Sequence, residues 1–312
     1  MIEEVPSRCG PRPRRVLLGI LAAMASPSSL SPTDPVALQD RIDDVLRSFL
    51  SARRQELAWI DPRATDPIDE VIGLFEAGGK RIRPAFCYWG FRAAGGSHGG
   101  PILRAAASLE LLHTMALIHD DVMDGSAARR GRPTVHTRQA EAAARRGQPE
   151  PERIGIAVAI LAGDLASVLA DQLLLESGFA PVRLAAALDR YHRMRTEMAA
   201  GAHLGLIGAD ADARRLASLK GGSYTVEGPL LIGAALAEAS ILVATRLERF
   251  GEPLGEAFQL LDDLRDGDAA PGVAMIDANK LIAEARDALD PDVLDPDAVQ
   301  ALGLLADLVG GS

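Results

Sequence analysis

The sequence is poor in aromatic residues, in cysteine and in period-two alternation. Phe, Trp and Tyr make up 4% of the 312 residues, and Cys9 and Cys87 are the only cysteines. Because pleated sheets favour aromatic and β-branched side chains, this composition favours helices, and we predict no strand. Two cysteines without CxxC spacing exclude the usual zinc and dithiol motifs and indicate reduced thiols.

An excess of positive charge is also missing. The chain has 33 Lys and Arg against 43 Asp and Glu, a formal net charge of −10. Broad nucleic-acid binding depends on Lys and Arg that displace phosphate counterions, so we expect no nucleic-acid partner. A local basic pocket for a small phosphorylated ligand remains compatible with this balance.

The N-terminus carries a segment that resembles a targeting signal. Arginines precede a short apolar run at residues 16–23, followed by small residues, in the manner of a secretory signal. The run is too short to span a bilayer. We prefer a translation start at Met24. In either case we expect residues 1–34 to be a disordered or mis-assigned extension outside the fold, and residues 35–312 to form the domain. We therefore expect no stable membrane insertion and a cytoplasmic location for the protein.

Helical periodicity dominates from residue 35 onward. Asp34 before Pro35 is a typical helix start. Apolar spacing predicts helices at 102–123, 154–175, 182–198, 211–219, 225–239 and 254–264. The polar and basic residues 129–153 are expected to form an irregular, mobile flap. Without a fixed repeat, we predict a single all-α domain.

Two segments, 117–124 and 259–266, join an apolar run to a DDxxD triplet. The triplets are Asp120, Asp121 and Asp124, and Asp262, Asp263 and Asp266. Carboxylates crowded at a helix C-terminus repel one another and oppose the helix dipole. Hard cations such as Mg²⁺, which share their shell with substrate phosphates, relieve this repulsion. One triplet alone is more simply a solvated acidic helix end, but two favour a metal-lined rim of a helical bundle.

Several basic residues stand where they can meet an anion. Lys80 and Arg83 lie three positions apart after a double glycine, and the planar Arg fork suits diphosphate oxygens. The further candidates are two adjacent arginines, a histidine seven residues before the first triplet and a lysine at a helix break: Arg129, Arg130, His113 and Lys220. Each of these alone is equally compatible with a solvated turn or a structural histidine.

Taken in order, the blocks GGKRIRP, LIHDDVMD, RRGRPTVH, AILAGD, KGGSYT and AFQLLDD resemble the trans-isoprenyl diphosphate synthase (polyprenyl synthetase) family. The resemblance implies a helical bundle around a deep central cavity, a homodimer, and several Mg²⁺ ions, with Mn²⁺ as a substitute, held by both triplets. It implies that isopentenyl diphosphate is bound by Lys80, Arg83, His113 and Arg130, and an allylic diphosphate by Arg129, Lys220 and Gln259. The groups implied in catalysis are Asp120, Asp121, Asp124, Asp262, Lys220 and Gln259.

The reaction that the resemblance implies is a prenyl transfer. Metal ions and basic groups stabilise the departing diphosphate, and the allylic cation, kept from water, is attacked by isopentenyl diphosphate. Dimethylallyl, geranyl or farnesyl diphosphate would be the primer. In this family, side chains below the first triplet set product length. Leu112, Met115 and Ala116 are not aromatic, so geranylgeranyl diphosphate is the expected product.

The chain departs from the family pattern in places. Gly221 stands where threonine is usual, and residues 201–206 read GAHLGL instead of GQYLDL. After Asp266 the usual Gly-Asp…Gly-Lys loop is not recognisable, and Lys280 is the only lysine left. We expect a shortened flap over the diphosphates, with slower turnover or closure by another subunit.

Other functions remain open on the sequence. The shortened tail and Gly221 suit an inactive or regulatory subunit that partners an active synthase, although both triplets are intact. His113, His119 next to Asp120, and His136 suggest a helical metal phosphohydrolase, which leaves Lys80 and the second triplet without a role. A class I terpene cyclase would carry an Asn/Ser/Glu metal motif in place of the second triplet.

Overall fold

The computed structural model describes residues 34–129, 131–208, 218–266 and 275–311, without the side chains of Ser218, Lys220 and Asp266. The expectation for the N-terminal extension therefore lies outside the described residues. Most of the described chain is helical, which confirms the all-α prediction. Its helices are α2 (Pro35–Ile60), η1 (Pro62–Thr65), α3 (Asp66–Glu76), α4 (Ile82–Ala93), α5 (Gly100–Met123), α6 (Val135–Arg145), α7 (Pro151–Leu175), α8 (Pro181–Leu206), η2 (Ser218–Glu227), α10 (Gly228–Leu236), α11 (Ile241–Asp266), α12 (Met275–Asp287) and α13 (Pro296–Gly310).

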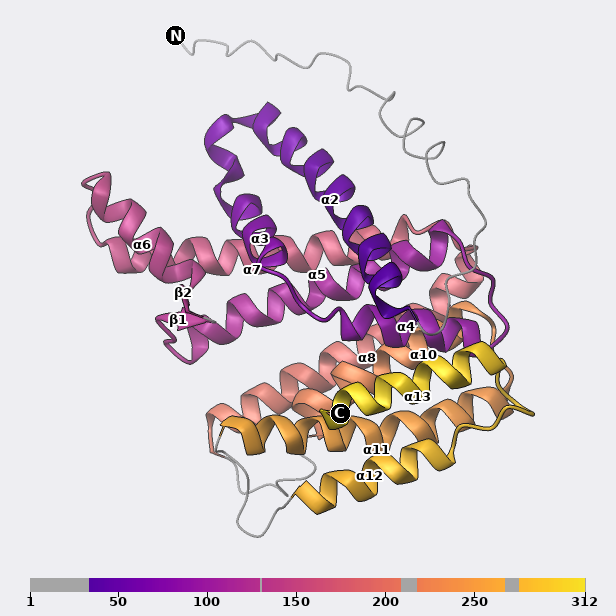
Figure 1. Cartoon of the computed structure of the whole chain (residues 1–312). Coiled ribbons are helices and arrows are strands. Elements are labelled where there is room, and N and C mark those ends of the chain that lie inside the picture. Colours follow the sequence, from indigo (N-terminus) through magenta and orange to yellow (C-terminus); the bar gives the residue numbers. More distant parts are fainter. Residues whose placement is uncertain (1–33, 130, 209–217, 267–274, 312) are drawn as a thin grey trace.

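The helices form two groups that meet at α4. Figure 1 shows α5, α6 and α7 with α2 and α3 on one side, and α8, α10, α11, α12 and α13 on the other. Helix α4 contacts α5 of the first group and α10 and α13 of the second. A single hydrophobic core runs through both groups, and it includes Leu112 of α5, Phe86 of α4 and Leu230 of α10.

Helix starts follow local sequence signals. The Asp34 side chain accepts a hydrogen bond from the Ala37 N–H at 3.0 Å, and Pro35 occupies the first turn of α2, as the sequence predicts. The predicted helix 102–123 is α5, which is buried on nearly every face and ends at the first triplet. The predicted helices 154–175 and 182–198 are α7 and α8.

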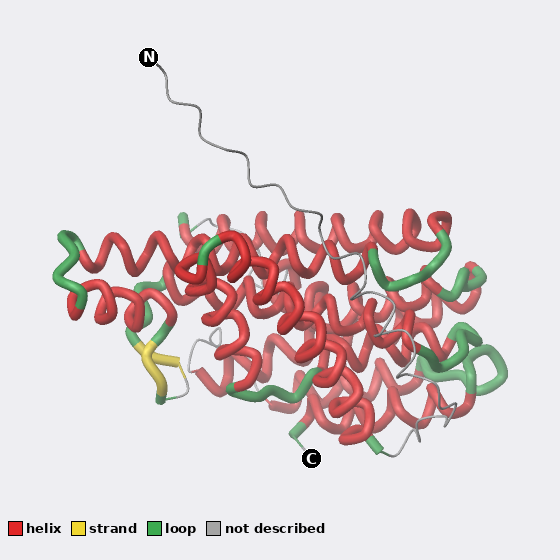
Figure 2. Tube along the Cα trace, turned by 90° about the horizontal axis from the view of Figure 1, so that it is seen from above, coloured by secondary structure: helices red, strands yellow, loops and turns green. Residues whose placement is uncertain are grey.

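The prediction of an irregular segment at 129–153 is wrong. The chain forms a short antiparallel ladder between β1 (Ala128–Arg129) and β2 (Arg132–Pro133), then the helix α6. The ladder also corrects the prediction of no strand. Alanine-rich residues at 140–144 favour a helix, but α6 has few apolar residues to produce a periodic signal. Figure 2 shows the hairpin in yellow at one end of the bundle.

Two other element boundaries differ from the prediction. The predicted helix at 225–239 is divided between η2, a π-helix, and α10. The predicted helix at 254–264 is the end of α11, which begins at Ile241 and continues through Pro253. Most of the predicted helix at 211–219 lies outside the described residues.

Helices α5 and α7 are long and apolar enough to cross a membrane by length and composition alone. The apolar stretch of α5 is 72% buried inside the bundle, which is typical of a core helix, whereas that of α7 is 39% buried. The outer face of α7 exposes Ile156, Ile160, Leu161 and Val168. This row of large apolar side chains is called the α7 face below.

Candidate active site

A cavity of about 1330 Å³ brings together most of the described candidate residues. It is lined from the loop before α4, from α4 itself, from α5, from the β-hairpin and from α11. The predicted site residues in its wall are Lys80, Arg83, His113, Asp121, Arg129 and Asp262. Basic and acidic groups that are far apart in the sequence therefore face one cavity.

Arg83 lies in the first turn of α4 and is fixed by η2. Its Nη2 donates a hydrogen bond to the Thr225 hydroxyl at 2.8 Å, and its guanidinium lies 4.4 Å from the centroid of the Tyr224 ring. The His113 ring lies 6.2 Å from the same tyrosine ring. Two residues that the sequence placed with one diphosphate thus share a buried aromatic neighbour. Burial raises the pKa of Tyr224 and keeps its hydroxyl neutral.

The first triplet occupies the end of α5, where the chain turns back on itself. The Asp124 N–H donates to the Asp120 carbonyl at 2.8 Å, and the Ser126 N–H to the Asp121 carbonyl at 3.0 Å. The Thr134 hydroxyl donates to the Ser126 carbonyl at 2.8 Å, which ties the start of α6 to this turn. The hairpin is thereby held against the carboxylates.

Arg129 of β1 uses this turn to reach the triplet. Its Nε donates to the Asp121 carboxylate at 2.9 Å, and the side chain of Asp121 is 4% exposed. The family resemblance implied a diphosphate ligand for Arg129 and metal for Asp121, and did not anticipate their ion pair.

The second triplet lies in the last turn of α11, next to η2. The Gln259 amide donates to the Asp263 carboxylate at 2.7 Å. A Cβ atom on Gly221 would lie 1.6 Å from Gln259 Oε1, so the glutamine occupies the space that a side chain at 221 would need. The glycine that departs from the family pattern thus has a specific packing partner. The η2 helix supplies the wider turn that π-helices bring to functional sites.

Some predicted site residues fall outside this description. Arg130 and the side chains of Lys220 and Asp266 are not among the described groups. Among the described residues, no group of three His, Cys, Asp or Glu side chains lies close enough to hold a metal ion. Carboxylates from both halves of the molecule, Asp121 and Asp262, nevertheless line the same cavity. Such oxygen ligands fit Mg²⁺ that is shared with a diphosphate.

The structure adds cavity residues that carry no motif. Glu70 of α3 accepts hydrogen bonds from Arg138 Nε at 3.1 Å and from the Gln139 amide at 2.7 Å. These bonds dock α6 onto α3 at the cavity wall, to which all three residues contribute. No spacing in the sequence indicates this contact, since it joins two polar helix faces that are about 70 residues apart.

Comparison with known proteins agrees with the all-α bundle. The family model described as polyprenyl synthetase matches residues 68–274. The chain belongs to the polyprenyl synthetase family.

Individual relatives carry more specific names. The chain is 34% identical over 201 residues to the geranylgeranyl diphosphate synthase of Methanosarcina mazei, covering 62% of this chain and 56% of that protein. It is 29% identical over 236 residues to the geranylgeranyl diphosphate synthase of Sulfolobus acidocaldarius, covering 72% and 62%. The matches span less than two thirds of the length of these relatives.

Among solved structures, the fold resembles the geranylgeranyl pyrophosphate synthase of Corynebacterium glutamicum. That structure holds an isoprenyl diphosphate and magnesium. The TM-score is 0.78 at 27% identity, and the alignment covers 90% of this chain and 99% of the other. The similarity therefore extends through nearly the whole described bundle.

Proposed function

We propose that this protein is a Mg²⁺-dependent prenyltransferase that joins isopentenyl diphosphate to an allylic diphosphate. The observation that carries the proposal is the single cavity in which Lys80 and Arg83 face Asp121, Arg129 and Asp262. Two diphosphates need cationic groups on more than one wall, and metal-bridged diphosphates need carboxylates between them. The names of the relatives point to the same substrate class.

The basic loop would bind isopentenyl diphosphate. Arg83 presents a planar fork that is already held by Thr225, and Lys80 adds a second charge from an exposed position beside it. His113 contributes from α5. A substrate held at close range by pre-positioned groups meets the allylic carbon at a high effective concentration.

Asp120, Asp121 and Asp262 would hold Mg²⁺, which neutralises charge on the departing diphosphate when bound. The chain's own residues supply the rest of that stabilisation. Arg129, close to the metal-binding carboxylates, offers hydrogen bonds to the departing oxygens, and Gln259 adds an amide dipole from α11.

The apolar stretch of α5 below the first triplet would receive the growing prenyl chain. Leu112 is fully buried and Met115 is 9% exposed. Neither side chain is aromatic, and methionine is flexible. These residues and the names of the relatives support geranylgeranyl diphosphate as the product, made from dimethylallyl, geranyl or farnesyl diphosphate.

Association into a homodimer completes the proposal. The α7 face exposes a row of large apolar side chains along one helix. Faces of this kind are typically covered by a partner. A second copy of the same helix, related by a two-fold axis, would cover this one. We place the enzyme in the cytoplasm, where its water-soluble substrates would be available.

An incorporation assay tests the function. Purified protein with Mg²⁺, radiolabelled isopentenyl diphosphate and each primer should yield a geranylgeranyl product, and Asp120→Ala should abolish it. A product of another length would revise the role of Met115. A folded protein that binds diphosphates but incorporates none with any primer would refute the synthase and favour a regulatory subunit.

A further inference from the structure

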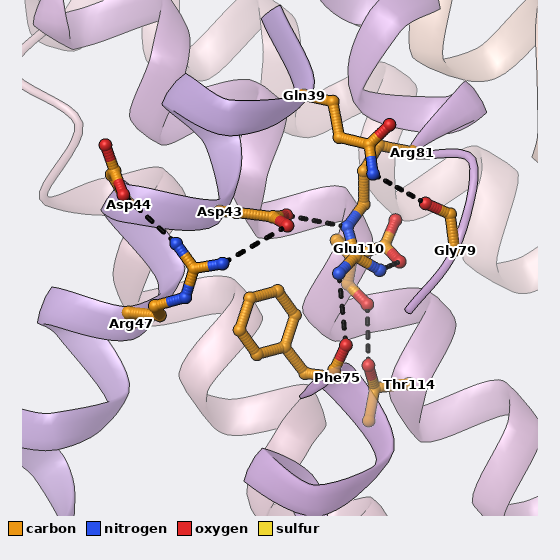
Figure 3. A network of polar contacts seen from close by, with 9 residues as sticks. All are labelled: Gln39, Asp43, Asp44, Arg47, Phe75, Gly79, Arg81, Glu110 and Thr114. Atoms are coloured by element: carbon orange, nitrogen blue, oxygen red, sulfur yellow. Dashed lines mark hydrogen bonds and ion pairs between the residues drawn. The ribbon is translucent and has the colours of Figure 1, made fainter. Parts of the chain in front are cut away.

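Arg81 stands between two proposed diphosphate-binding residues, yet it points away from solvent. The residue is 5% exposed, whereas Lys80 is exposed and Arg83 is half-buried. Its φ of 49° lies in the left-handed region, which a non-glycine residue adopts only when the surroundings enforce it. Figure 3 shows the contacts that enforce it.

The Arg81 guanidinium joins three helices to the loop. Its Nε donates to Asp43 of α2 at 2.8 Å, and its Nη1 to Glu110 of α5 at 2.7 Å. Its Nη2 donates to the Phe75 carbonyl of α3 at 3.0 Å, and the group lies 4.6 Å from the centroid of the Phe75 ring. Burial alone lowers the pKa of Arg81, but the two carboxylates outweigh it and raise the pKa.

The backbone on the other side of Lys80 is fixed by the same cluster. A Cβ atom on Gly79 would lie 2.9 Å from Arg81 Nη1, so a side chain at residue 79 would crowd the guanidinium. The Gln39 amide of α2 donates to the Gly79 carbonyl at 3.2 Å. Lys80 is therefore held by its neighbours on both sides, although its own side chain stays exposed.

We infer that Arg81 is a positioning residue for substrate binding. Its buried ion pairs fix the loop so that Lys80 and Arg83 converge on one diphosphate, that of isopentenyl diphosphate. The inference rests on the proposed function for the identity of the ligand. The ion pair between Arg81 and Glu110 also links the loop to α5, because Glu110 lies three residues before His113 on that helix.

A substitution series distinguishes positioning from stability alone. Arg81→Lys keeps the charge but cannot make the three-way contact. Arg104→Lys is the matched control. Arg104 is a half-buried arginine whose Nε and Nη2 donate to the Ser177 carbonyl at 2.9 and 2.6 Å. Unlike Arg81, it does not line the cavity. Both variants should lower the melting temperature.

Only Arg81→Lys should change substrate binding. We expect KM for isopentenyl diphosphate to rise ~tenfold or more while KM for the allylic substrate stays within about twofold. Arg104→Lys should leave both KM values unchanged. Equal rises in both KM values, or an unchanged KM for isopentenyl diphosphate in folded Arg81→Lys protein, would overturn the inference.

Calorimetric titration with inorganic diphosphate keeps this test separate from the proposed function. If the wild-type chain makes no product, the function fails, but Arg81→Lys should still bind diphosphate ~tenfold more weakly than wild type and Arg104→Lys. Equal affinity in all three would refute the positioning role. If Arg81→Lys does not fold, Glu110→Gln, which weakens one ion pair, must show the same selective loss, and normal affinity in that variant counts against the role.

Discussion

The carboxamide of Gln259 can occupy its position only because residue 221 is a glycine without a side chain. The two residues come from α11 and η2, and a Cβ atom at 221 would overlap the glutamine oxygen. The Gln259 amide in turn bonds the Asp263 carboxylate. A sequence comparison alone interprets Gly221 as the loss of a hydroxyl, whereas the packing shows that an amide fills the vacated space.

We predict that Gly221→Ala displaces Gln259 and lowers kcat ~tenfold, because the amide leaves both its position and its bond to Asp263. In a Gln259→Ala background the same substitution should have little further effect, since nothing remains to be displaced. Steady-state kinetics on the four proteins of this double-mutant cycle provide the measurement. Additive losses would show that the two positions act independently.

His98 gives the fold a pH dependence. The Tyr88 hydroxyl lies 3.0 Å from His98 Nδ1, and burial, with smaller contributions from Arg41 and Arg92, lowers the pKa of His98 below the ordinary value of a histidine. As the pH falls, His98 is therefore protonated at a higher pH in the unfolded chain than in the folded protein. The resulting stability is complete above the unfolded pKa and is lost as the pH falls towards the folded pKa.

We predict that the melting temperature falls between pH 7.5 and pH 5.5, and that His98→Gln falls less steeply over this range because glutamine does not titrate. Scanning calorimetry of both proteins in matched ionic strength tests this. The same slope in both proteins would rule out His98 as a contributor.

At the scale of elements, apolar periodicity explains what the sequence could predict. The helix α5 is apolar and ends in a charged triplet. Its apolar periodicity therefore predicts that the segment is a helix, where the helix ends, and that Asp120 lies at this end. Helix α6 is polar on most faces and is held by Glu70, which no local pattern indicates. The anchoring of Arg83 by Thr225 joins residues 142 positions apart, and only the fold reveals it.

Helix α13 depends on its N-cap. The Asp295 side chain accepts a hydrogen bond from the Ala298 N–H at 3.1 Å, and its own N–H donates to the Ala93 carbonyl of α4 at 3.2 Å. We predict that Asp295→Ala lowers the free energy of unfolding by about 1 kcal/mol, the usual value of such a cap. Asp292→Ala, an exposed carboxylate just upstream, is the control. Urea unfolding measures both, and equal effects would contradict a capping role.

At the scale of the molecule, the cavity lies between helices that are distant in sequence, and the α7 face lies outside it.

We predict that wild-type protein has twice the chain mass of 32.9 kDa in solution. Leu161→Glu on the α7 face should yield monomers, because a charge cannot be buried in an apolar contact. Light scattering after size-exclusion chromatography measures both masses. Leu304→Glu on α13, another exposed leucine, is the control. A monomeric wild type would refute the proposed association.

The packing of α4 against α10 has a consequence for protein synthesis. A Cβ atom on Gly90 would lie 2.2 Å from the Leu230 carbonyl oxygen, so the two helices are in backbone contact. Helix α4 leaves the ribosome long before α10, and at 5–20 residues per second the delay is roughly 7–30 s. During that time Phe86 of α4 also lacks Phe250 of α11, whose ring centroid lies 6.4 Å from its own in the folded protein. We expect a nascent chain that stops before residue 228 to bind chaperones through this helix. Such a chain also lacks α11 and therefore Asp262 of the cavity wall.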